Sequence, residues 1–453
     1  MNVPRAIFRQ YDVRGIVGAE LTPELARGLG RAYATLGWER MGRAPVLAVG
    51  RDNRPSGRTL SAGVRAGIVE AGGIAIDVGE LPTPALYFAV HALGTDGGMQ
   101  VTGSHNPPEF NGFKMVLAGD SLHGEDIVRL FEMISLEQWR SGAGRETADG
   151  SVLGKYRDAI LARHALKRPV KVVVDCGNGV GSLVAVATLE ALGAEVIPLF
   201  CDSDGSFPNH HPDPTVIENL RDLQAEVRRT GAELGIAFDG DADRIGAVDE
   251  NGGVVFGDQL LVLYGRDAVR RFGPGLAVIF DVKCSEVLPQ ALRAAGAVPE
   301  MWKTGHSLIK ARMKELHSPL AGEMSGHMFF GGDWFGFDDA LFAAARLLEI
   351  VSAGKGGLSV LLADLPRTSA TPEIRVDCTE ERKFALVAEA AKHFATRYPV
   401  NTIDGVRMTF PKGWGLVRAS NTQPILVLRF EATDEASLAA YQGEVMEWLQ
   451  ANP

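Results

Sequence analysis

The stretch VKVVVDCGNGVGSLVAVATLEAL, residues 170–192, decides the fold class of this chain. Its run of valines ends at the glycine-rich turn 175–179, and a helical pattern follows over residues 182–192. An apolar run, a tight turn and a helix of roughly 10–15 residues are typical of a βα unit in a buried, partly parallel sheet. The same succession begins at Val46–Gly50 and at Leu276–Phe280. These three openings predict three related α/β modules.

The C-terminal part of the chain has a different pattern. Short strand-like runs alternate with longer helical patterns, which predicts an α+β arrangement with antiparallel pairing. The expected strands are Glu373–Asp377, Gly415–Arg418 and Ile425–Glu431, and the expected helices are Glu380–Arg397 and Glu435–Leu449. Gly, Pro and polar residues gather near 142–150, 251–253 and 364–372, so we expect domain boundaries there.

The composition excludes several classes of protein. The chain has 453 residues, of which 46 are basic and 56 acidic, and its net charge of −10 is the wrong sign for a general nucleic-acid binder. No apolar run reaches the ~18 residues of a membrane span. The four cysteines lie far apart without a CxxC pair, so we expect neither a disulfide scaffold nor a zinc site. Residues 1–15 are charged and unlike a signal peptide, which favours a reduced, cytoplasmic setting.

A candidate nucleophile lies in the loop Thr102-Gly103-Ser104-His105-Asn106-Pro107-Pro108, which follows a strand-like run. Glycine and proline constrain this loop, so the Ser104 hydroxyl can face a reactant beside His105. Serine acts in covalent catalysis when it is activated or already modified. The same residues also fit a polar turn whose side chains bond their own backbone, and the loop alone does not decide between the two.

Three carboxylates alternate in Asp239-Gly240-Asp241-Ala242-Asp243, directly after the apolar run Leu234–Phe238. In an extended segment they point to one side, and such crowding costs stability unless a cation lies among them. Hard oxygen ligands suit Mg²⁺, which commonly also takes a phosphate oxygen. A calcium-binding loop would need glycine where Arg244 stands. A solvated acidic hairpin turn stays open as the other interpretation.

Two further polar loops are candidates for substrate binding. In Gly322-Glu323-Met324-Ser325-Gly326-His327, alternating polar side chains can hold sugar hydroxyls, although they also fit an edge strand. The loop Arg418-Ala419-Ser420-Asn421-Thr422-Gln423-Pro424 can hold a phosphate, although a plain turn between strands is an alternative. Near similar turns stand Arg14, Lys283 and His306, each of which, taken singly, is more often a cap or a surface residue.

In this order along the chain, the four loops resemble those of the α-D-phosphohexomutase superfamily. The resemblance runs from Tyr11 to Thr422, and each loop falls in a different expected domain. Residues 102–107, Met324 in its loop and Ser420-Asn421-Thr422 are most similar to bacterial phosphomannomutase/phosphoglucomutase. Phosphoglucosamine mutases are similar but usually have Gln in place of Met324 and Gly in place of Asn421.

The resemblance implies an α/β fold with three related α/β domains of mixed sheets and a C-terminal α+β domain around a central cleft. The implied domains are 1–149 with a phosphoserine loop, 150–252 with a metal-binding loop, 253–366 with a sugar-recognition loop and 367–453 with a phosphate-binding loop. Ser104 would be carried as phosphoserine. Its phosphate and the side chains of Asp239, Asp241 and Asp243 would together hold Mg²⁺.

The resemblance also implies roles for the remaining site residues. Lys114 and His306 are candidates for proton transfer, and Arg14 and His105 would stabilise charge nearby. The implied substrate-binding residues are Glu323 and Ser325 for sugar hydroxyls, Tyr11, Arg244, Lys283 and His327 lining the cleft, and Arg418, Ser420, Asn421 and Thr422 for the phosphate that does not react.

The expected activity is reversible interconversion of hexose 1-phosphate and hexose 6-phosphate, with mannose and/or glucose as the sugar. It would proceed through phosphoserine and a hexose 1,6-bisphosphate that serves as intermediate and activator. The expected partners are sugar monophosphates, with no nucleic acid and no membrane, and the chain would be a monomer or weak dimer. The alternatives are a phosphoglucosamine mutase, a Mg²⁺-dependent sugar phosphatase that hydrolyses the phosphoserine, and a sugar-phosphate-binding sensor without catalysis.

Overall fold

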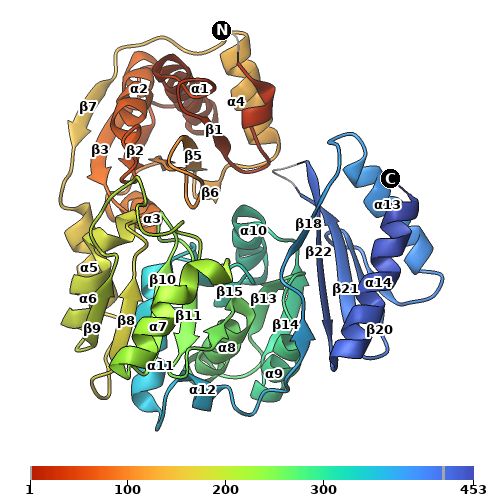
Figure 1. Cartoon of the computed structure of the whole chain (residues 1–453). Helices are drawn as coiled ribbons and strands as arrows, with labels where there is room; N and C mark the ends of the chain where they lie inside the picture. The colour runs from red at the N-terminus through yellow and green to blue at the C-terminus, as the bar shows by residue number, and fades with distance from the viewer. Residues whose placement is uncertain (1–2, 421–423, 453) are drawn as a thin grey trace. The chain divides into compact units, whose positions relative to one another are not determined.

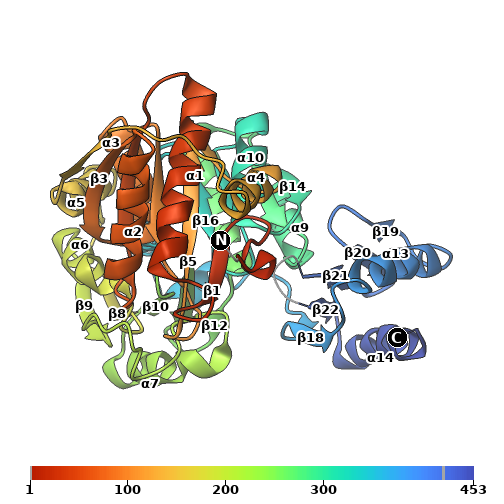
Figure 2. The same cartoon turned by 90° about the horizontal axis from the view of Figure 1, so that it is seen from above.

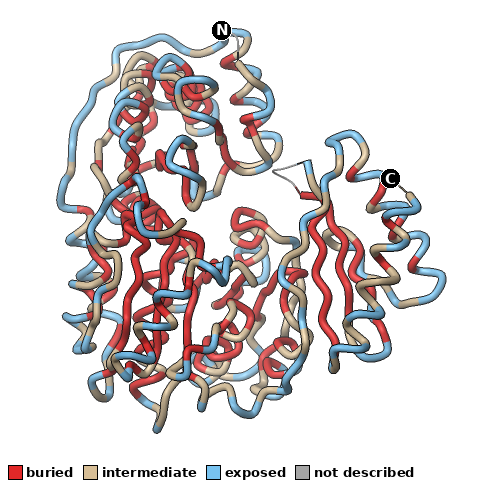
Figure 3. The backbone as a smooth tube through the Cα atoms, in the orientation of Figure 1, coloured by how far each residue is buried: buried red, intermediate tan, exposed pale blue. Residues whose placement is uncertain are grey.

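The structure, a computed structural model, describes residues 3–420 and 424–452. Four β-sheets form within these residues, and helices flank them (Figure 1). The strands are largely buried, whereas much of the connecting chain is exposed (Figure 3). No helix in these ranges combines the length and the hydrophobicity that a bilayer crossing requires.

The N-terminal sheet contains β1 (Val13–Ile16), β2 (Val46–Arg51), β3 (Ile74–Glu80), β4 (Gly97–Val101), β5 (Phe110–Leu117), β6 (Asp120–Ser121) and β7 (Arg145–Ala148). Its strand order is β1-β5-β4-β2-β3-β7, with β6 paired to β5. Strands β4, β2, β3 and β7 run parallel, whereas β5 is antiparallel to β4 and β1. Every residue of β4 is buried, as expected for a strand covered on both faces. The predicted βα opening at Val46–Gly50 is confirmed.

Two helices, α1 (Pro23–Met41) and α2 (Gly57–Glu70), pack side by side (Figure 2). Glycines let their backbones touch: a Cβ on Gly30 would overlap the carbonyl oxygen of Val64, and one on Gly67 would overlap that of Arg27. The module also contains η1 (Arg5–Ile7), α3 (Thr83–Ala92) and α4 (Glu125–Ser135).

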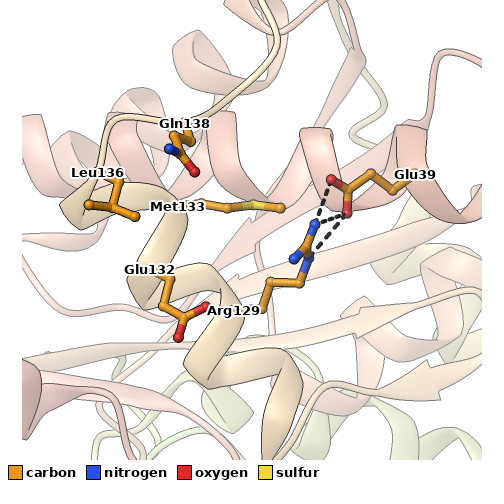
Figure 4. Close-up of a pocket in the computed structure, with 6 residues that line it drawn as sticks. All are labelled: Glu39, Arg129, Glu132, Met133, Leu136 and Gln138. Carbon is orange, nitrogen blue, oxygen red and sulfur yellow. Dashed lines mark hydrogen bonds and ion pairs between the residues drawn. The ribbon is translucent and has the colours of Figure 1, made fainter.

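Helix α4 carries a shallow polar hollow on the surface of this module (Figure 4). It is lined by Glu39, Arg129, Glu132, Met133, Leu136 and Gln138. Arg129 and Glu39 form an exposed ion pair of 2.8 Å there. Such a pair contributes only about 0–1 kcal/mol. The apolar face of α4, with Ile127 and Leu130 in the core, therefore does more to hold the helix.

The second sheet contains β8 (Lys171–Asp175), β9 (Glu195–Leu199), β10 (Leu234–Phe238), β11 (Ile245–Asp249) and β12 (Val254–Val255), in the order β12-β11-β10-β8-β9. Strands β9, β8 and β10 run parallel to one another. Strand β11 is antiparallel to both of its neighbours, β10 and β12. The helices are α5 (Val152–Leu161), η2 (Val180–Leu183), α6 (Ala185–Ala191), η3 (Ile217–Leu220) and α7 (Arg221–Thr230). The single helix expected at 182–192 is wrong: non-helical dihedral angles at Val184 (φ −142°, ψ −25°) separate η2 from α6.

The third module begins with α8 (Gly257–Phe272) and the parallel strands β13 (Ala277–Asp281), β14 (Val298–Trp302) and β15 (Leu320–Gly322). It also contains α9 (Val287–Ala295), α10 (His306–Leu316), β16 (Met328–Phe330), α11 (Ala340–Ala353) and α12 (Leu358–Leu361). The predicted opening, with an apolar strand followed by a turn and helix α9, is confirmed.

The C-terminal sheet contains β17 (Ser369–Ala370), β18 (Ile374–Asp377), β19 (Val400–Asn401), β20 (Val406–Phe410), β21 (Gly413–Ala419) and β22 (Ile425–Ala432). Its pairings are antiparallel, as predicted. Helices α13 (Lys383–Phe394) and α14 (Glu435–Ala451) cover one face of it (Figure 1). Helix α13 is shorter than the expected 380–397 at both ends. Residues 380–382 form a turn in which Thr379 accepts the N–H of Arg382, and residues 395–397 form another turn.

The chain divides into two compact units. Unit 1 comprises Met1–Tyr264 and Ser325–Leu362, and unit 2 comprises Gly265–Met324 and Ala363–Pro453. Within unit 2, Trp414 and Leu416 of β21 pack on Val282 in a small buried cluster. Arg407 of β20 also donates to the carbonyl oxygen of Val282. The C-terminal sheet therefore shares a core with the loop after β13.

The close packing of α1 on α2 makes a prediction about stability. Gly67→Ala should destabilise the protein by about 1–3 kcal/mol, because its methyl group overlaps the backbone of α1. Gly154→Ala is the matched control, since Gly154 lies exposed in α5 with open space around its Cα, and alanine favours a helix by up to about 1 kcal/mol. Thermal unfolding should show a lower midpoint for the first variant and an unchanged or higher midpoint for the second. Equal midpoints would contradict the packing described here.

Candidate active site

Ser104 lies in the loop after β4 with a strained backbone. Its φ is +48°, in the left-handed region that residues other than glycine rarely adopt. The residue is 2% exposed. Its Oγ donates to Asp239 Oδ2 at 2.8 Å and lies 3.1 Å from His105 Nδ1. Backbone strain that persists in a folded protein is often found at functional sites, and here the expected nucleophile contacts an expected metal ligand.

A buried arginine that the sequence analysis missed holds this loop. The Arg54 guanidinium donates to the backbone carbonyl oxygens of Ser104, Asn106, Pro107 and Phe110. Asp52 pairs with Arg54 at 3.2 Å and accepts the N–H of Gly103. A Cβ on Gly103 would overlap the guanidinium, so this position requires glycine. The sequence signal is weak: two charged residues in a polar turn after a strand.

The three aspartates converge through a turn and not through an extended segment. Ala242 has a φ of +58°, which reverses the chain between Asp241 and Asp243. Asp239 Oδ1 accepts the N–H groups of Asp243 and Arg244 at 3.0 and 3.1 Å. All three carboxylates are fully buried, with oxygens within 4.8 Å of one another. The segment is therefore a turn between the antiparallel strands β10 and β11, and the carboxylates meet although the chain is not extended.

Lys114, from β5, is the cation that faces this cluster. Its Nζ donates to Asp241 Oδ2 at 2.7 Å and also bonds Asp243, and Thr83 donates to Asp241 Oδ2 at 2.5 Å. Burial alone would lower the pKa of Lys114, but the charges of Asp241 and Asp243 outweigh it and raise that pKa. Counted as ionised, one ammonium (+1) and three carboxylates (−3) give these four groups a charge of −2, and the Arg244 guanidinium, which lowers the pKa of Asp239, adds positive charge nearby.

The cluster fits a divalent cation. Asp241 Oδ1 and Asp243 Oδ1 are buried without a hydrogen-bond partner, which is costly for charged oxygens. Burial, together with the charges of Asp243 and Asp241, raises the pKa of Asp239 well above its usual value. Converging carboxylate oxygens are the ligands that hard divalent ions prefer.

Arg14 and His105 flank the serine loop. Arg14 Nη1 donates to Asn106 Oδ1 at 3.0 Å, which places its guanidinium against the loop that carries Ser104. Enclosure of His105, helped by the nearby cations Arg244 and Arg14, lowers its pKa well below the usual value. His105 is therefore neutral near pH 7 in this state, and it can hydrogen-bond a charged group but adds no positive charge.

The first unit also brings Arg244 and His327 together. Arg244 Nε donates to His327 Nε2 at 3.0 Å, and the two residues form an isolated antiparallel bridge. Tyr11 and Ser325, which the resemblance also implies, are half-buried residues of the same unit.

The second unit holds the other implied sugar-binding residues. Lys283 Nζ lies 3.3 Å from Glu373 Oε2. Burial opposes its charge, but Glu373 and Asp281 raise the pKa of Lys283. Glu323 Oε1 accepts the N–H of Gly305 at 2.6 Å, directly before the buried His306 that begins α10.

Asp404, which the sequence analysis also missed, joins two loops of this unit. Its Oδ2 accepts from Arg418 Nε at 3.1 Å and from the backbone N–H of Thr304 at 3.0 Å. The loop before His306 and the expected phosphate-binding arginine are therefore neighbours. A lone aspartate in a turn of the C-terminal module gives no sequence signal for this contact.

The remaining phosphate-binding candidates follow Arg418. Ser420 is buried, and its carbonyl oxygen accepts from Lys383 Nζ at 2.6 Å. The backbone N–H of Ser420 donates to Ile425 at 3.0 Å. Asn421 and Thr422 lie outside the described residues.

Comparisons with known proteins cover most of the chain. Four phosphoglucomutase/phosphomannomutase family models match in chain order. They are alpha/beta/alpha domain I over residues 5–137, alpha/beta/alpha domain II over 154–253, alpha/beta/alpha domain III over 256–369 and the C-terminal domain over 373–447.

Full-length relatives agree with these matches. The chain is 50% identical to a phosphomannomutase/phosphoglucomutase of Pseudomonas aeruginosa, over 96% of this chain and 94% of that protein. It is 44% identical to a phosphoglucomutase of Neisseria gonorrhoeae, over 100% and 98%. A crystal structure of a phosphoglucomutase/phosphomannomutase family protein from Burkholderia thailandensis is 42% identical, with a TM-score of 0.92 over 99% of this chain and 98% of that one. The predicted fold class and resemblance are confirmed: the chain belongs to the phosphoglucomutase/phosphomannomutase family of the α-D-phosphohexomutase superfamily, in its bacterial form.

Proposed function

We propose that this chain is a phosphomannomutase/phosphoglucomutase, an isomerase that interconverts the 1- and 6-phosphates of mannose and/or glucose. One observation carries the proposal: the strained, buried Ser104 donates a 2.8 Å hydrogen bond to Asp239 in a cluster of three carboxylates. Relatives at 44% and 50% identity with these activities in their names support it. Those names do not favour the phosphoglucosamine mutase alternative.

Ser104 is the group that gives and receives the phosphoryl group. From phosphoserine, the bond between Oγ and phosphorus breaks while a sugar hydroxyl oxygen forms the new bond to phosphorus and loses its proton. The product is a hexose 1,6-bisphosphate. After this bisphosphate turns around, its other phosphoryl group returns to Ser104, which restores phosphoserine and releases the isomeric monophosphate.

Mg²⁺ is the cation that we assign to the acidic cluster, with Asp239, Asp241, Asp243 and the Ser104 phosphate as its ligands. When bound, Mg²⁺ supplies charge neutralisation for the phosphoryl group in transfer. The orphaned carboxylate oxygens and the three carboxylates gathered around one ammonium support this assignment.

Lys114 and His306 are the proposed proton-transfer groups. The raised pKa of Lys114 keeps its ammonium protonated near neutral pH, so in this state it stabilises negative charge and holds its proton tightly. Arg14, whose guanidinium donates to Asn106, would stabilise the same phosphoryl group. His105, neutral here, would act through a hydrogen bond.

The remaining residues bind the rest of the substrate. Glu323 and Ser325 would take sugar hydroxyls, while a guanidinium and turn N–H groups suit the phosphate that does not react. The proposed set is Tyr11, Arg244, Lys283 and His327 along the sugar, and Arg418, Ser420, Asn421 and Thr422 at that phosphate. The proposed domain ranges stay 1–149, 150–252, 253–366 and 367–453, and the matched family ranges support them.

Three finer expectations remain predictions. Hexose 1,6-bisphosphate should also act as activator, because it rephosphorylates an enzyme whose phosphoserine has been hydrolysed. The cysteine spacing supports a cytoplasmic setting. We also expect a monomer or weak dimer.

Replacing the nucleophile should abolish isomerisation. Ser104→Ala should lower turnover of glucose 1-phosphate and mannose 1-phosphate at least about 10³-fold, because no covalent intermediate can form. Mass spectrometry should locate a phosphate on Ser104 in the wild-type protein. Ser141→Ala, at an exposed position outside the site, should leave turnover unchanged.

The products separate the alternatives. A mutase yields hexose 6-phosphate with little inorganic phosphate, whereas a phosphatase releases phosphate steadily. A sensor binds the sugar phosphate without converting it, and Ser104→Ala then changes affinity alone. Steady phosphate release, or binding without conversion, would replace the proposed function.

Without a bound metal, the thermal stability of the protein should depend strongly on the Lys114 ammonium. Lys114→Met leaves three buried carboxylates without their ammonium, a type of change that costs about 3–5 kcal/mol. The metal-free variant should therefore melt below the metal-free wild type, and MgCl₂ should raise its midpoint by more. Thermal unfolding after EDTA treatment, with and without MgCl₂, measures both. Asp239→Asn, which loses a ligand, should show a smaller Mg²⁺ shift than wild type; equal shifts in all three proteins would rule out the metal assignment.

A further inference from the structure

Two adjacent buried aspartates, Asp338 and Asp339, lie between β16 and α11 and have different surroundings. Asp339 has an evident structural role, because Oδ1 accepts the N–H of Phe342 at the start of α11 and the hydroxyl of Tyr156. Its Oδ2 accepts from Trp334 Nε1 at 3.0 Å. Asp338 instead faces His327, so it does not share the helix-capping role of Asp339.

The backbone fixes Asp338 next to His327. Asp338 pairs with Phe329 in an antiparallel bridge, and the N–H of Asp339 donates to Met328 at 3.0 Å. His327 directly precedes β16, so this pairing brings the two side chains together. Asp338 Oδ2 lies 3.3 Å from His327 Nδ1, and both residues are buried.

The other ring nitrogen decides which tautomer His327 adopts. Arg244 Nε lies 3.0 Å from His327 Nε2, and a guanidinium offers donors but no acceptor. His327 Nε2 must therefore present a lone pair, because two N–H groups would repel each other at this distance. The ring proton of the neutral imidazole is then on Nδ1 and needs an acceptor.

Two carboxylates lie near Nδ1. Asp338 Oδ2 is at 3.3 Å and Asp243 Oδ1 at 3.6 Å, both within ion-pair distance but outside hydrogen-bond geometry in this state. Asp243 already bonds Lys114 through its other oxygen and belongs to the proposed metal ligands. Asp338 is the nearer acceptor and has no place in that ligand set.

We propose that Asp338 is a positioning residue that fixes the Nδ1–H tautomer and ring orientation of His327 and, through His327 Nε2, the orientation of the Arg244 guanidinium. An acceptor that holds the far nitrogen of a functional histidine in one tautomer is a familiar device in metal and catalytic sites. This inference rests on the proposed function, in which His327 and Arg244 contact the sugar phosphate.

A cation among Asp243, His327 and Asp338 is the competing interpretation, since their ligand atoms also lie within 4.8 Å of one another. A cation on Nδ1 requires the proton on Nε2, where it would face the Arg244 donor. The hydrogen bond from Arg244 therefore opposes metal binding at this place.

The first experiment reads the tautomer without using activity. The full chain is labelled with ¹⁵N-histidine, and His327→Gln identifies the His327 ring signals. Wild type should show the proton on Nδ1, and Asp338→Ala should give a mixture of tautomers. Asp338→Asn, which keeps the shape and one acceptor oxygen, should retain Nδ1–H.

Asp339→Asn is the matched structural control: it should lower the thermal midpoint and leave the His327 signals unchanged. A wild-type signal with the proton on Nε2, or a His327 nitrogen shifted by ligation when MgCl₂ or ZnCl₂ is added, would overturn the proposal. Because this readout needs no turnover, its result stands even if the protein proves not to be a mutase.

The second experiment is a double-mutant cycle on kcat/KM with glucose 1-phosphate. Asp338→Ala should lower kcat/KM about 10–100-fold, the range typical of lost partners behind a functional histidine, and Asp338→Asn should lower it less. In a His327→Ala background, Asp338→Ala should change kcat/KM less than about twofold, because its effect passes through His327. Additive losses would mean that Asp338 acts on the fold in general, and would contradict the positioning role.

Discussion

The ion pairs of Lys114 with Asp241 and Asp243 are the interaction on which the site depends. They join β5 of the first sheet to the turn between β10 and β11 of the second. Each partner is buried and would be costly alone, so neither β5 nor the turn can move away without leaving an unpaired buried charge. Lys114 does not satisfy all of the carboxylate oxygens. Asp241 Oδ1 and Asp243 Oδ1 have no hydrogen-bond partner, so a cation can bind to them.

Much of the fold was predictable because buried strands are encoded locally. The valine run before Asp175 and the apolar run before Asp239 each became a buried strand that ends at a polar turn. In parallel sheets the strand ends carry the loops that reach ligands, so the positions of Ser104 and Asp239 could be predicted together with the strands. Helix ends were less predictable, since they depend on local turn contacts such as that of Thr379 with Arg382.

The rest of the site could not be predicted, because it depends on contacts between distant residues. Arg54 is one of many charged residues after a strand, and its partners lie about fifty positions away. Asp404 likewise meets Thr304 and Arg418 only in the folded unit. The left-handed backbone of Ser104 also contradicts the ordinary preference of serine; surrounding structure imposes it. Residues of this kind hold the loops that carry the candidate groups, and they form no motif of their own.

The hydrogen bonds from Arg54 to the serine loop have a consequence for the order in which this part of the chain can fold. Arg54 follows β2 and the loop follows β4, and these strands are parallel neighbours in one sheet. Parallel neighbours cannot pair until the intervening chain has folded back, so the loop takes this shape only once β2 and β4 lie side by side. A chain in which these two strands are not yet paired therefore cannot hold Ser104 in the left-handed backbone conformation seen here.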